Sequence, residues 1–413
     1  MERTKNLLIV NSCFPIELKD GSLVVKDGLS SYSVGIAEQL KDRYSVTIVS
    51  PGRSSSFSYA GIKFINWGDQ SSSSTKIGNM DHWLNTFRYV LANDFDIIIV
   101  HSAVTVFSSP VADVFRAQCI GIIHDTHPGK NSVLFNLWRD IWLRYSKKLD
   151  LVLSDNDYGR QRLIETYKYD PQKVHCTGSG VDLDRFSFSS VKEDRLLFIG
   201  RLVRSKNVAE LVQGFKGLLR ENKNVKLVLI GNGVLNDKLV EDVSENGLHD
   251  QVEILSNLND EQKIAELKRA KIYVSLSQVE GFGISLVEGM ACGAVPVVSD
   301  IPAHRFVFQG RKVGFLVKDA GELAARASFL LKNEAVRGEM ARAGRTLVEE
   351  VWNWKKVQER YERAMSQLPE KRLSPFSQKI KKPVKIGILK LIVSLFYFLV
   401  IETSFYKARN DGE

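Results

Sequence analysis

The sequence contains little cysteine. Among its 413 residues there are four, Cys13, Cys119, Cys176 and Cys292, with no regular spacing between them. This pattern excludes a disulfide-stapled scaffold and predicts small, mostly buried thiols in a reducing compartment. No signal peptide opens the chain, because residues 1–6 lead directly into a strand-like apolar segment at residues 7–10. We therefore expect the bulk of the protein to lie in the cytoplasm.

Signatures of nucleic-acid binding are also missing. The net charge of +9 is compatible with nucleic acid, anionic lipid or a phosphorylated substrate as partner. No zinc-finger spacing and no aromatic RNA-binding pattern supports the first of these, so we expect no nucleic-acid partner. A hydrophobic content of 44% is ample for packed cores and excludes a disordered or fibrous chain.

The order of apolar runs predicts two α/β domains. Runs typical of buried strands lie at residues 7–10, 46–49, 97–100, 119–123 and 151–153, and again at 196–199, 227–230, 272–276 and 295–298. Helical patterns lie between them, for example at 30–40, 207–220, 260–269, 321–332 and 334–349. This alternation predicts two doubly wound, Rossmann-like domains, over residues 1–187 and 188–352. A ligand is expected between them, at the carboxyl ends of the second domain's strands.

Two acids frame a glycine-rich turn after the run at 272–276. Glu280 precedes Gly-Phe-Gly, a helix pattern starts near Ser285, and Glu288 lies within it. Such a turn leaves backbone N–H groups unpaired, which suits phosphates and hydroxyls. Carboxylates beside it can accept hydrogen bonds from sugar or ribose hydroxyls. The alternative is an ordinary strand–turn–helix corner with two surface acids.

Together with Gly-Ala-Val-Pro-Val-Val-Ser at 293–299, this segment resembles the paired-glutamate motif of the retaining glycosyltransferases of family four, also called glycosyl transferases group 1. The resemblance covers about residues 7–365 and implies the GT-B fold with a central cleft. It implies that Glu288 accepts the ribose hydroxyls and that Glu280 lies near the transferred sugar. The backbone of Phe282, Gly283 and Ile284 would contact donor hydroxyl or phosphate oxygens.

The resemblance also gives the domains their roles. Residues 1–187 become the acceptor-side domain, 188–352 the nucleotide-sugar domain, and 353–368 a cross-over helix returning to the first domain. In that helix Val357, Tyr361 and Met365 fall on one side, and Trp352 and Trp354 are most simply packing anchors.

A basic turn follows the run at 196–199. Gly200 lets the chain turn, Arg201 can fork two oxygens and Lys206 can supply a point charge, as a diphosphate requires. The alternative is a solvated basic turn. The turn resembles the family's phosphate-binding element, which implies that Arg201 and Lys206 stabilise the departing nucleoside diphosphate. Arg204 is a weaker candidate.

Two further glycines, Gly231 and Gly233, follow the run at 227–230. They look like part of a dinucleotide fingerprint, but Asn236 stands where the third glycine belongs and the position in the domain is wrong for a dehydrogenase. We interpret them as allowing close backbone approach near the nucleotide, with a structural turn as the equal alternative.

In the first domain, Gly28 is the nearest match to the family's glycine loop, although Asp27 replaces its usual first glycine. His124 follows the run at 119–123, where the family often carries a histidine that reaches the donor sugar. We place His124 in the active site, with Asp125 and His101 as further candidates; a satisfied structural histidine is the alternative for each.

We predict no metal and no cofactor apart from the nucleotide sugar itself. Asp155-Asn156-Asp157 and Asp182-Leu183-Asp184 satisfy a loose Asp-x-Asp pattern, but neither lies in the phosphate-binding half of the chain. Arg201 and Lys206 already perform the electrostatic task of a metal.

The tail at 369–413 differs from the rest. Lysines at 379, 381, 382, 385 and 390 precede or border an apolar run at 391–401. That run is short for a span, which needs about 20 residues. Extended back to residue 384, the segment predicts either a span that includes two lysines or an interfacial anchor, and the lysines upstream would meet anionic lipid. A docked C-terminal helix is the alternative. We predict a peripheral enzyme at the inner membrane face.

These features predict a retaining, metal-independent hexosyltransferase of polysaccharide assembly acting on a glycan or lipid-linked acceptor. The Ser-Asp-Ile-Pro segment at 299–302 resembles mannosyltransferases, which makes GDP-mannose the first donor and a UDP-hexose the second. A GT-B nucleotide-sugar epimerase and a non-catalytic binding module remain alternatives.

Overall fold

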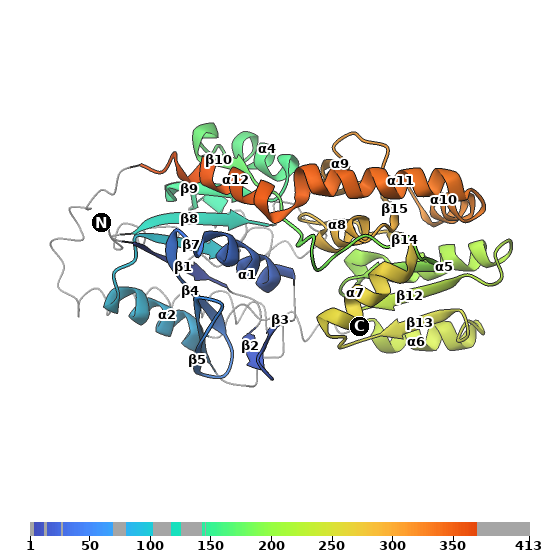
Figure 1. The fold of residues 1–413 in the computed structure, drawn as a ribbon, viewed down its shortest axis with the longest axis horizontal. Coiled ribbons are helices and arrows are strands. Elements are labelled where there is room, and N and C mark those ends of the chain that lie inside the picture. The colour runs from blue at the N-terminus through green and yellow to red at the C-terminus, as the bar shows by residue number, and fades with distance from the viewer. Residues whose placement is uncertain are drawn as a thin grey trace. The chain divides into compact units, whose positions relative to one another are not determined.

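The computed structural model describes residues 4–11, 15–25, 28–68, 80–101, 117–124, 143–144 and 146–369. The chain divides into two compact units (Figure 1). The first unit contains the residues up to Thr177 and those from Gln358 onward, and the second contains Gly178–Val357.

The first unit is built on a sheet of eight strands in the order β10-β9-β8-β7-β1-β4-β6-β5. Its central strand β1 (Lys5–Val10) pairs in parallel with β4 (Tyr44–Pro51) and β7 (Ile97–His101). The remaining parallel strands are β6 (Ile62–Trp67), β8 (Gln118–Ile123), β9 (Leu151–Ser154) and β10 (Val174–Cys176), and β5 (Ser55–Tyr59) is an antiparallel edge strand. All five strands predicted for this half are present.

Helices α1 (Gly28–Leu40), α2 (Met80–Ala92) and α4 (Asp157–Glu165) accompany this sheet. A hairpin of β2 (Ile16–Lys19) and β3 (Ser22–Val25) lies between β1 and α1 in the chain. Its turn contains two residues with positive φ, Asp20 at 49° and Gly21 at 77°.

The second unit has a six-stranded parallel sheet in the order β13-β12-β11-β14-β15-β16. The strands are β11 (Glu193–Ile199), β12 (Lys226–Ile230), β13 (Val252–Leu255), β14 (Ala270–Ser275), β15 (Val295–Ser299) and β16 (Phe315–Val317). From β11 the chain first adds β12 and β13 on one side and then crosses to β14 on the other. The strand order therefore reverses between β11 and β14, the point at which open α/β sheets bind ligands.

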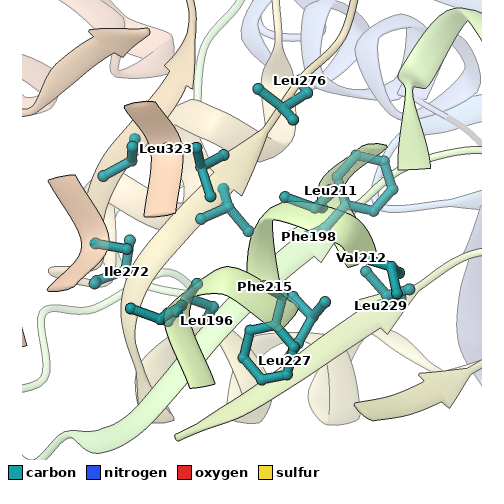
Figure 2. Close-up of a cluster of buried hydrophobic side chains, with 14 of the residues drawn as sticks. Leu196, Phe198, Leu211, Val212, Phe215, Leu227, Leu229, Ile272, Leu276 and Leu323 are labelled. Atoms are coloured by element: carbon teal, nitrogen blue, oxygen red, sulfur yellow. The ribbon is translucent and has the colours of Figure 1, made fainter. Parts of the chain in front are cut away.

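Both faces of this second sheet are covered by helices. Alternate strand residues point to opposite faces, so that Leu196 and Phe198 enter one core and Leu197 enters another. Figure 2 shows the first core, in which Leu211 and Phe215 of α5 (Val208–Leu219) join Phe198. The other helices are α6 (Asn236–Glu245), α7 (Asp260–Arg269), α8 (Ile284–Ala291), α9 (Pro302–Phe308), α10 (Ala320–Lys332) and α11 (Glu334–Leu347). Two doubly wound α/β sheets are thus confirmed.

A turn of π-helix (Val348–Trp352) and α12 (Trp354–Met365) follow α11. The expected buried side of α12 is confirmed, since Val357, Tyr361 and Met365 are all buried. Trp352 is buried as well, and its indole N–H donates to the carbonyl of Val307 at 2.9 Å. The unit boundary after Val357 falls within α12, so this helix begins in the second unit and ends in the first.

Cys119, Cys176 and Cys292 are free thiols, while Cys13 lies outside the described residues. Within the described ranges, no helix is both long enough and apolar enough to cross a bilayer. From residue 370 onward the predicted tail lies outside the description.

Candidate functional site

The turns after β11 and β14 are joined directly to each other. The backbone N–H of Gln278 donates to the carbonyl of Ser205 at 2.9 Å, and the Gln278 amide donates to the Asn207 side chain at 3.0 Å. The basic turn at 200–207 and the segment leading to Glu280 therefore meet where the strand order reverses.

Ser285 fixes the first turn of α8 to the same place. Its hydroxyl donates to the carbonyl of Ile199 at 3.0 Å and lies 2.7 Å from the hydroxyl of Tyr273. Burial raises the pKa of Tyr273, and the nearby carboxylates of Glu280 and Glu288 raise it further, so this phenol stays neutral. The helix that carries Glu288 is thereby held against the end of β11.

Lys206 and Glu280 form an ion pair. The Lys206 ammonium lies 2.5 Å from Glu280 Oε1, which also accepts a hydrogen bond from the Ser277 hydroxyl at 2.8 Å. Burial opposes ionisation of Glu280, but the neighbouring groups, Lys206 foremost, together outweigh it and hold the pKa of that carboxyl below its usual value. The sequence assigned these two residues separate ligands, whereas here each is the other's counter-ion.

A buried histidine is linked to this pair through Ser299 and Ser277. His304 in α9 donates from Nδ1 to the carbonyl of Ser299 at 2.7 Å, and the Ser299 hydroxyl donates to the carbonyl of Ser277 at 2.6 Å. Burial lowers the pKa of His304 although Glu280 opposes the shift, so the imidazole is neutral near pH 7. The sequence analysis missed His304; its one signal is its place just after β15, at the same sheet edge.

Glu288 also has a lysine partner. Its Oε1 accepts a hydrogen bond from the ammonium of Lys263 in α7 at 3.0 Å, and its side chain is 10% exposed. The interpretation of the two acids as surface acids is therefore wrong for Glu288, which is buried. Lys263 was not a sequence candidate, because no motif marks it.

Arg201 lies at the end of β11 with an exposed side chain. Within the part of the chain that the structure describes, its guanidinium makes no hydrogen bond or ion pair. Arg204 is exposed as well. Arg201 is thus a cation in the same turn as Lys206 that no described residue neutralises.

Gly231 and Gly233 let the turn after β12 touch the turn after β11. A Cβ atom would lie 1.9 Å from the carbonyl oxygen of Gly200 at position 231, and 2.1 Å from that of Leu202 at position 233. The backbone N–H of Leu202 donates to the carbonyl of Asn232 at 2.9 Å across this contact. The close approach here is between two protein turns, which favours the structural interpretation; contact with a donor stays a prediction.

Gly283 caps α8 with φ of 97°, a left-handed conformation that side chains disfavour. The backbone N–H groups of Gly283, Ile284 and Ser285 have no carbonyl acceptor among the described residues. Phe282 is buried, and its ring lies 5.1 Å from that of Trp352. Its side chain therefore anchors the corner, and contact of its backbone with a donor stays a prediction.

In the first unit, a second group of polar residues lies where β7, β8 and β9 end. His124 Nδ1 lies 2.5 Å from Asp155 Oδ2, and its Nε2 lies 3.4 Å from Nδ1 of the buried His101. The ring of Tyr32 stands edge-on to both imidazoles. Burial and then His124 lower the pKa of His101 well below its usual value. The two predicted histidines are thus together, with Asp155 as a partner that the sequence did not predict for them.

Other sequence candidates have local roles. Asn156 caps α4 through the N–H of Gly159, and Asp182 accepts the N–H groups of Asp184 and Arg185. No cluster of metal-ligating side chains occurs among the residues in the described ranges. Gly28 is the exposed first residue of α1, while Asp27 and Asp125 lie outside the description.

Comparison with known proteins gives two family matches. Residues 182–347 match the family described as Glycosyl transferases group 1, and residues 26–185 match the one described as Glycosyltransferase Family 4. Between them the two matches span both units.

Curated relatives and a solved structure agree with these matches. The chain is 29% identical over 136 residues to a GDP-mannose:cellobiosyl-diphosphopolyprenol alpha-mannosyltransferase of Xanthomonas campestris, covering 32% of this chain and 36% of that one, about a third of its length. It is 25% identical over 352 residues to the phosphatidyl-myo-inositol mannosyltransferase of Mycolicibacterium smegmatis. This match covers 80% of this chain and 88% of that protein. The structure of sucrose-phosphate synthase from Thermosynechococcus elongatus superposes with a TM-score of 0.71 at 16% identity. The superposition covers 88% of this chain and 99% of that one. The predicted GT-B arrangement of two parallel α/β sheets is confirmed.

Proposed function

Because this chain belongs to the glycosyl transferases group 1, also called glycosyltransferase family four, we propose that it transfers a hexose from a nucleotide sugar to a glycan or lipid-linked acceptor. The anomeric configuration is retained. The observation that carries the proposal is the Lys206–Glu280 pair at the reversal point of the second sheet, with Arg201 in the same turn as Lys206. The start of α8, the helix of Glu288, is tied to the end of β11, and its first N–H groups find no carbonyl acceptor among the described residues.

The chemistry follows from the charges. The acceptor hydroxyl attacks the anomeric carbon on the face that the diphosphate leaves, the bond from that carbon to the phosphate oxygen breaks, and the same oxygen takes the hydroxyl proton. Negative charge then grows on the leaving group. Arg201 and Lys206 stabilise it in a site where low dielectric strengthens their effect.

Lys206 must exchange partners for this to happen. It is paired with Glu280 in this structure, so an incoming diphosphate competes with a carboxylate that carries half its charge. Glu280, released from Lys206, is free to accept hydrogen bonds from the hydroxyls of the sugar. With two cations supplying the positive charge, the proposed reaction uses no metal.

Mannose from GDP-mannose is our first choice of donor, and a UDP-hexose is the second. The relatives from Xanthomonas and Mycolicibacterium are both named as mannosyltransferases, and both names include a lipid acceptor. The Ser-Asp-Ile-Pro segment at 299–302 supports the same choice. Action at the inner membrane face on a lipid-linked acceptor belongs to this proposal.

The direct test is a thermal-shift panel with GDP, UDP and ADP, since a ligand that binds only the folded chain raises its melting temperature. We expect one nucleoside diphosphate to stabilise the protein. No shift with any of them at millimolar concentration would count against the proposal. Incubation with one nucleotide sugar and no acceptor separates an epimerase, which would still turn over.

Lys206→Ala is expected to reduce transfer by about 10² to 10³-fold, because it removes a cation from the developing phosphate charge. Lys223→Ala is the control, since Lys223 is an exposed lysine preceding β12 and so lies at the opposite end of the strands. Transfer is measured with radiolabelled donor. Because Glu280 loses its counter-ion in the variant, the melting temperature of Lys206→Ala without ligand checks that lost folding is not the cause. Unchanged transfer in Lys206→Ala would contradict the phosphate role and favour a binding module.

A further inference from the structure

We propose that Lys263 is a positioning residue for Glu288, which it orients so that the carboxylate reads the vicinal hydroxyls of the ribose in a nucleoside diphosphate. This inference rests on the proposed function. It assigns ribose selectivity to a pair of residues instead of to Glu288 alone.

Lys263 is placed by a well-defined helix start. It is the fourth residue of α7, whose first turn is closed by a capping box: Asn259 accepts from the N–H of Gln262 at 2.8 Å, and Gln262 accepts from that of Asn259 at 3.0 Å. The end of α7 from which Lys263 projects is therefore rigid. From there its ammonium reaches Glu288 on α8 at 3.0 Å.

Other groups hold the ammonium from further sides. It lies 5.3 Å from the centre of the Phe186 ring, within cation–π range, and 4.0 Å from Asp260 Oδ1. Asp260 is itself bound by Arg185 at 2.6 Å. Burial lowers the pKa of Lys263, but Glu288 and Asp260 outweigh it and leave it raised. The lysine is thus a fixed, permanently charged group rather than a mobile surface side chain.

This arrangement divides the two oxygens of Glu288 between two tasks. Lys263 engages Oε1, and no described residue donates a hydrogen bond to Oε2. An ionised carboxylate has about four acceptor positions, so one ammonium leaves room for two hydroxyls. A carboxylate that accepts from two neighbouring hydroxyls has to be held in one rotamer, and the hydrogen bond from Lys263 holds it there. Its charge also offsets the repulsion between Glu288 and a diphosphate.

A merely structural pair would join α7 to α8 without any effect on selectivity. Removal of the ribose hydroxyls from the ligand distinguishes the two roles. A site built to hydrogen-bond a hydroxyl discriminates strongly against the analogue that lacks it, because its own polar group is left unpaired. A structural pair contributes equally to binding of both ligands.

The experiment measures dissociation constants of the whole chain for GDP and UDP and for their 2′-deoxy counterparts by calorimetry. For the nucleotide that binds, wild type should prefer the ribose form by about tenfold or more. In Lys263→Met and Glu288→Gln the preference should fall to about twofold, and the double variant should lose no more than either single one. Lys263→Arg keeps the charge and should retain part of the preference. Lys268→Met, on the same helix and without an ion pair among the residues described, should behave as wild type.

Different results overturn different claims. If wild type binds neither nucleotide, the proposed function fails. If wild type prefers ribose and Lys263→Met keeps that preference, only the assignment of Lys263 is overturned and the pair is structural. Melting curves without nucleotide check the fold, and Lys263→Gln replaces the methionine variant if that one does not fold.

Discussion

Three ion pairs among the described residues join separate segments of the chain. Lys206 meets Glu280, Lys263 meets Glu288, and in the first unit His124 meets Asp155, all at 3.0 Å or less. Removing one member of such a pair leaves a buried charge alone, which is costly. Each pair therefore fixes the position of both its members in this structure.

The His124–Asp155 pair gives a test within a single Asp-x-Asp pattern. If His124 contacts the reacting sugars, Asp155→Asn should lower kcat about tenfold or more, because the neutral amide no longer fixes one tautomer of the imidazole. Asp157→Asn should leave kcat unchanged, since Asp157 is an exposed residue in the first turn of α4. Steady-state kinetics across a pH series separate the two variants.

The same two variants also test whether the pattern binds a metal. A divalent cation held by Asp155 and Asp157 would make both substitutions equally harmful, and added magnesium would rescue both. Equal losses in the two variants would therefore contradict a role for Asp155 in orienting His124.

Packing between helices decides which glycines of the second unit can be replaced by larger residues. In α5, a Cβ at Gly214 would lie 2.8 Å from the carbonyl oxygen of Ala320 at the start of α10. At Gly217, three residues on, it would lie 3.8 Å from the Cβ of Ala324, which is ordinary contact. The two glycines thus differ in how tightly they are packed, although both lie inside one helix.

Substitution by alanine is expected to have opposite effects on the free energy of unfolding at these two positions. Gly214→Ala should destabilise the protein by about 1 to 3 kcal/mol, because α5 and α10 must move apart. Gly217→Ala should stabilise it by about 0.5 to 1 kcal/mol, because alanine costs less backbone entropy in a helix. Melting temperatures of the two variants measure the difference, and a rise in both would show that the interface tolerates a methyl group.

The strands that the sequence predicted are those buried on both faces, such as β1, β7 and β14. Their continuous apolar runs leave little ambiguity. The four edge strands β5, β10, β13 and β16, which are short or only partly buried, were missed. Strand β6 was missed as well, although it lies inside the first sheet. So was the β2–β3 hairpin, which pairs Ile16 with Val25 and Leu18 with Leu23. Helix α11 was predicted to continue to residue 349, but after Leu347 it passes into a π-helical turn that ends at Trp352, buried against α9.

Motif residues of the candidate site were predictable because each follows a strand or opens a helix. Their partners were not. Lys263 lies 25 residues before Glu288, and Asp155 lies 31 after His124. Such pairs depend on which strands are neighbours in the sheet, and a local sequence pattern carries no information about that. His304 shows the same limit, since the adjacency of β14 and β15 brings it close enough to Glu280 for the two charges to interact.

The C-terminal segment carries part of the chain's positive charge. Of the excess of nine positive charges, several lie in the segment from residue 379 onward, outside the described residues, next to the apolar run at 391–401. Each lysine near an anionic surface contributes about 1 kcal/mol to binding, and the apolar run adds a hydrophobic contribution. We therefore expect the full chain to sediment with vesicles that contain anionic lipid, and less with neutral ones.

Deletion of residues 379–413 should abolish that sedimentation, whereas deletion of 402–413, which spares both the lysines at 379–390 and the apolar run, should not. Replacing the lysines at 379, 381 and 382 by glutamine separates charge from apolar contact, because only the charge contribution weakens with salt. Both deletions should keep the thermal shift with nucleotide, since the pairs around Lys206 and Glu288 lie in the second unit. Sedimentation that persists after the longer deletion would assign membrane contact to the folded units instead, and with it the place where a lipid-linked acceptor is met.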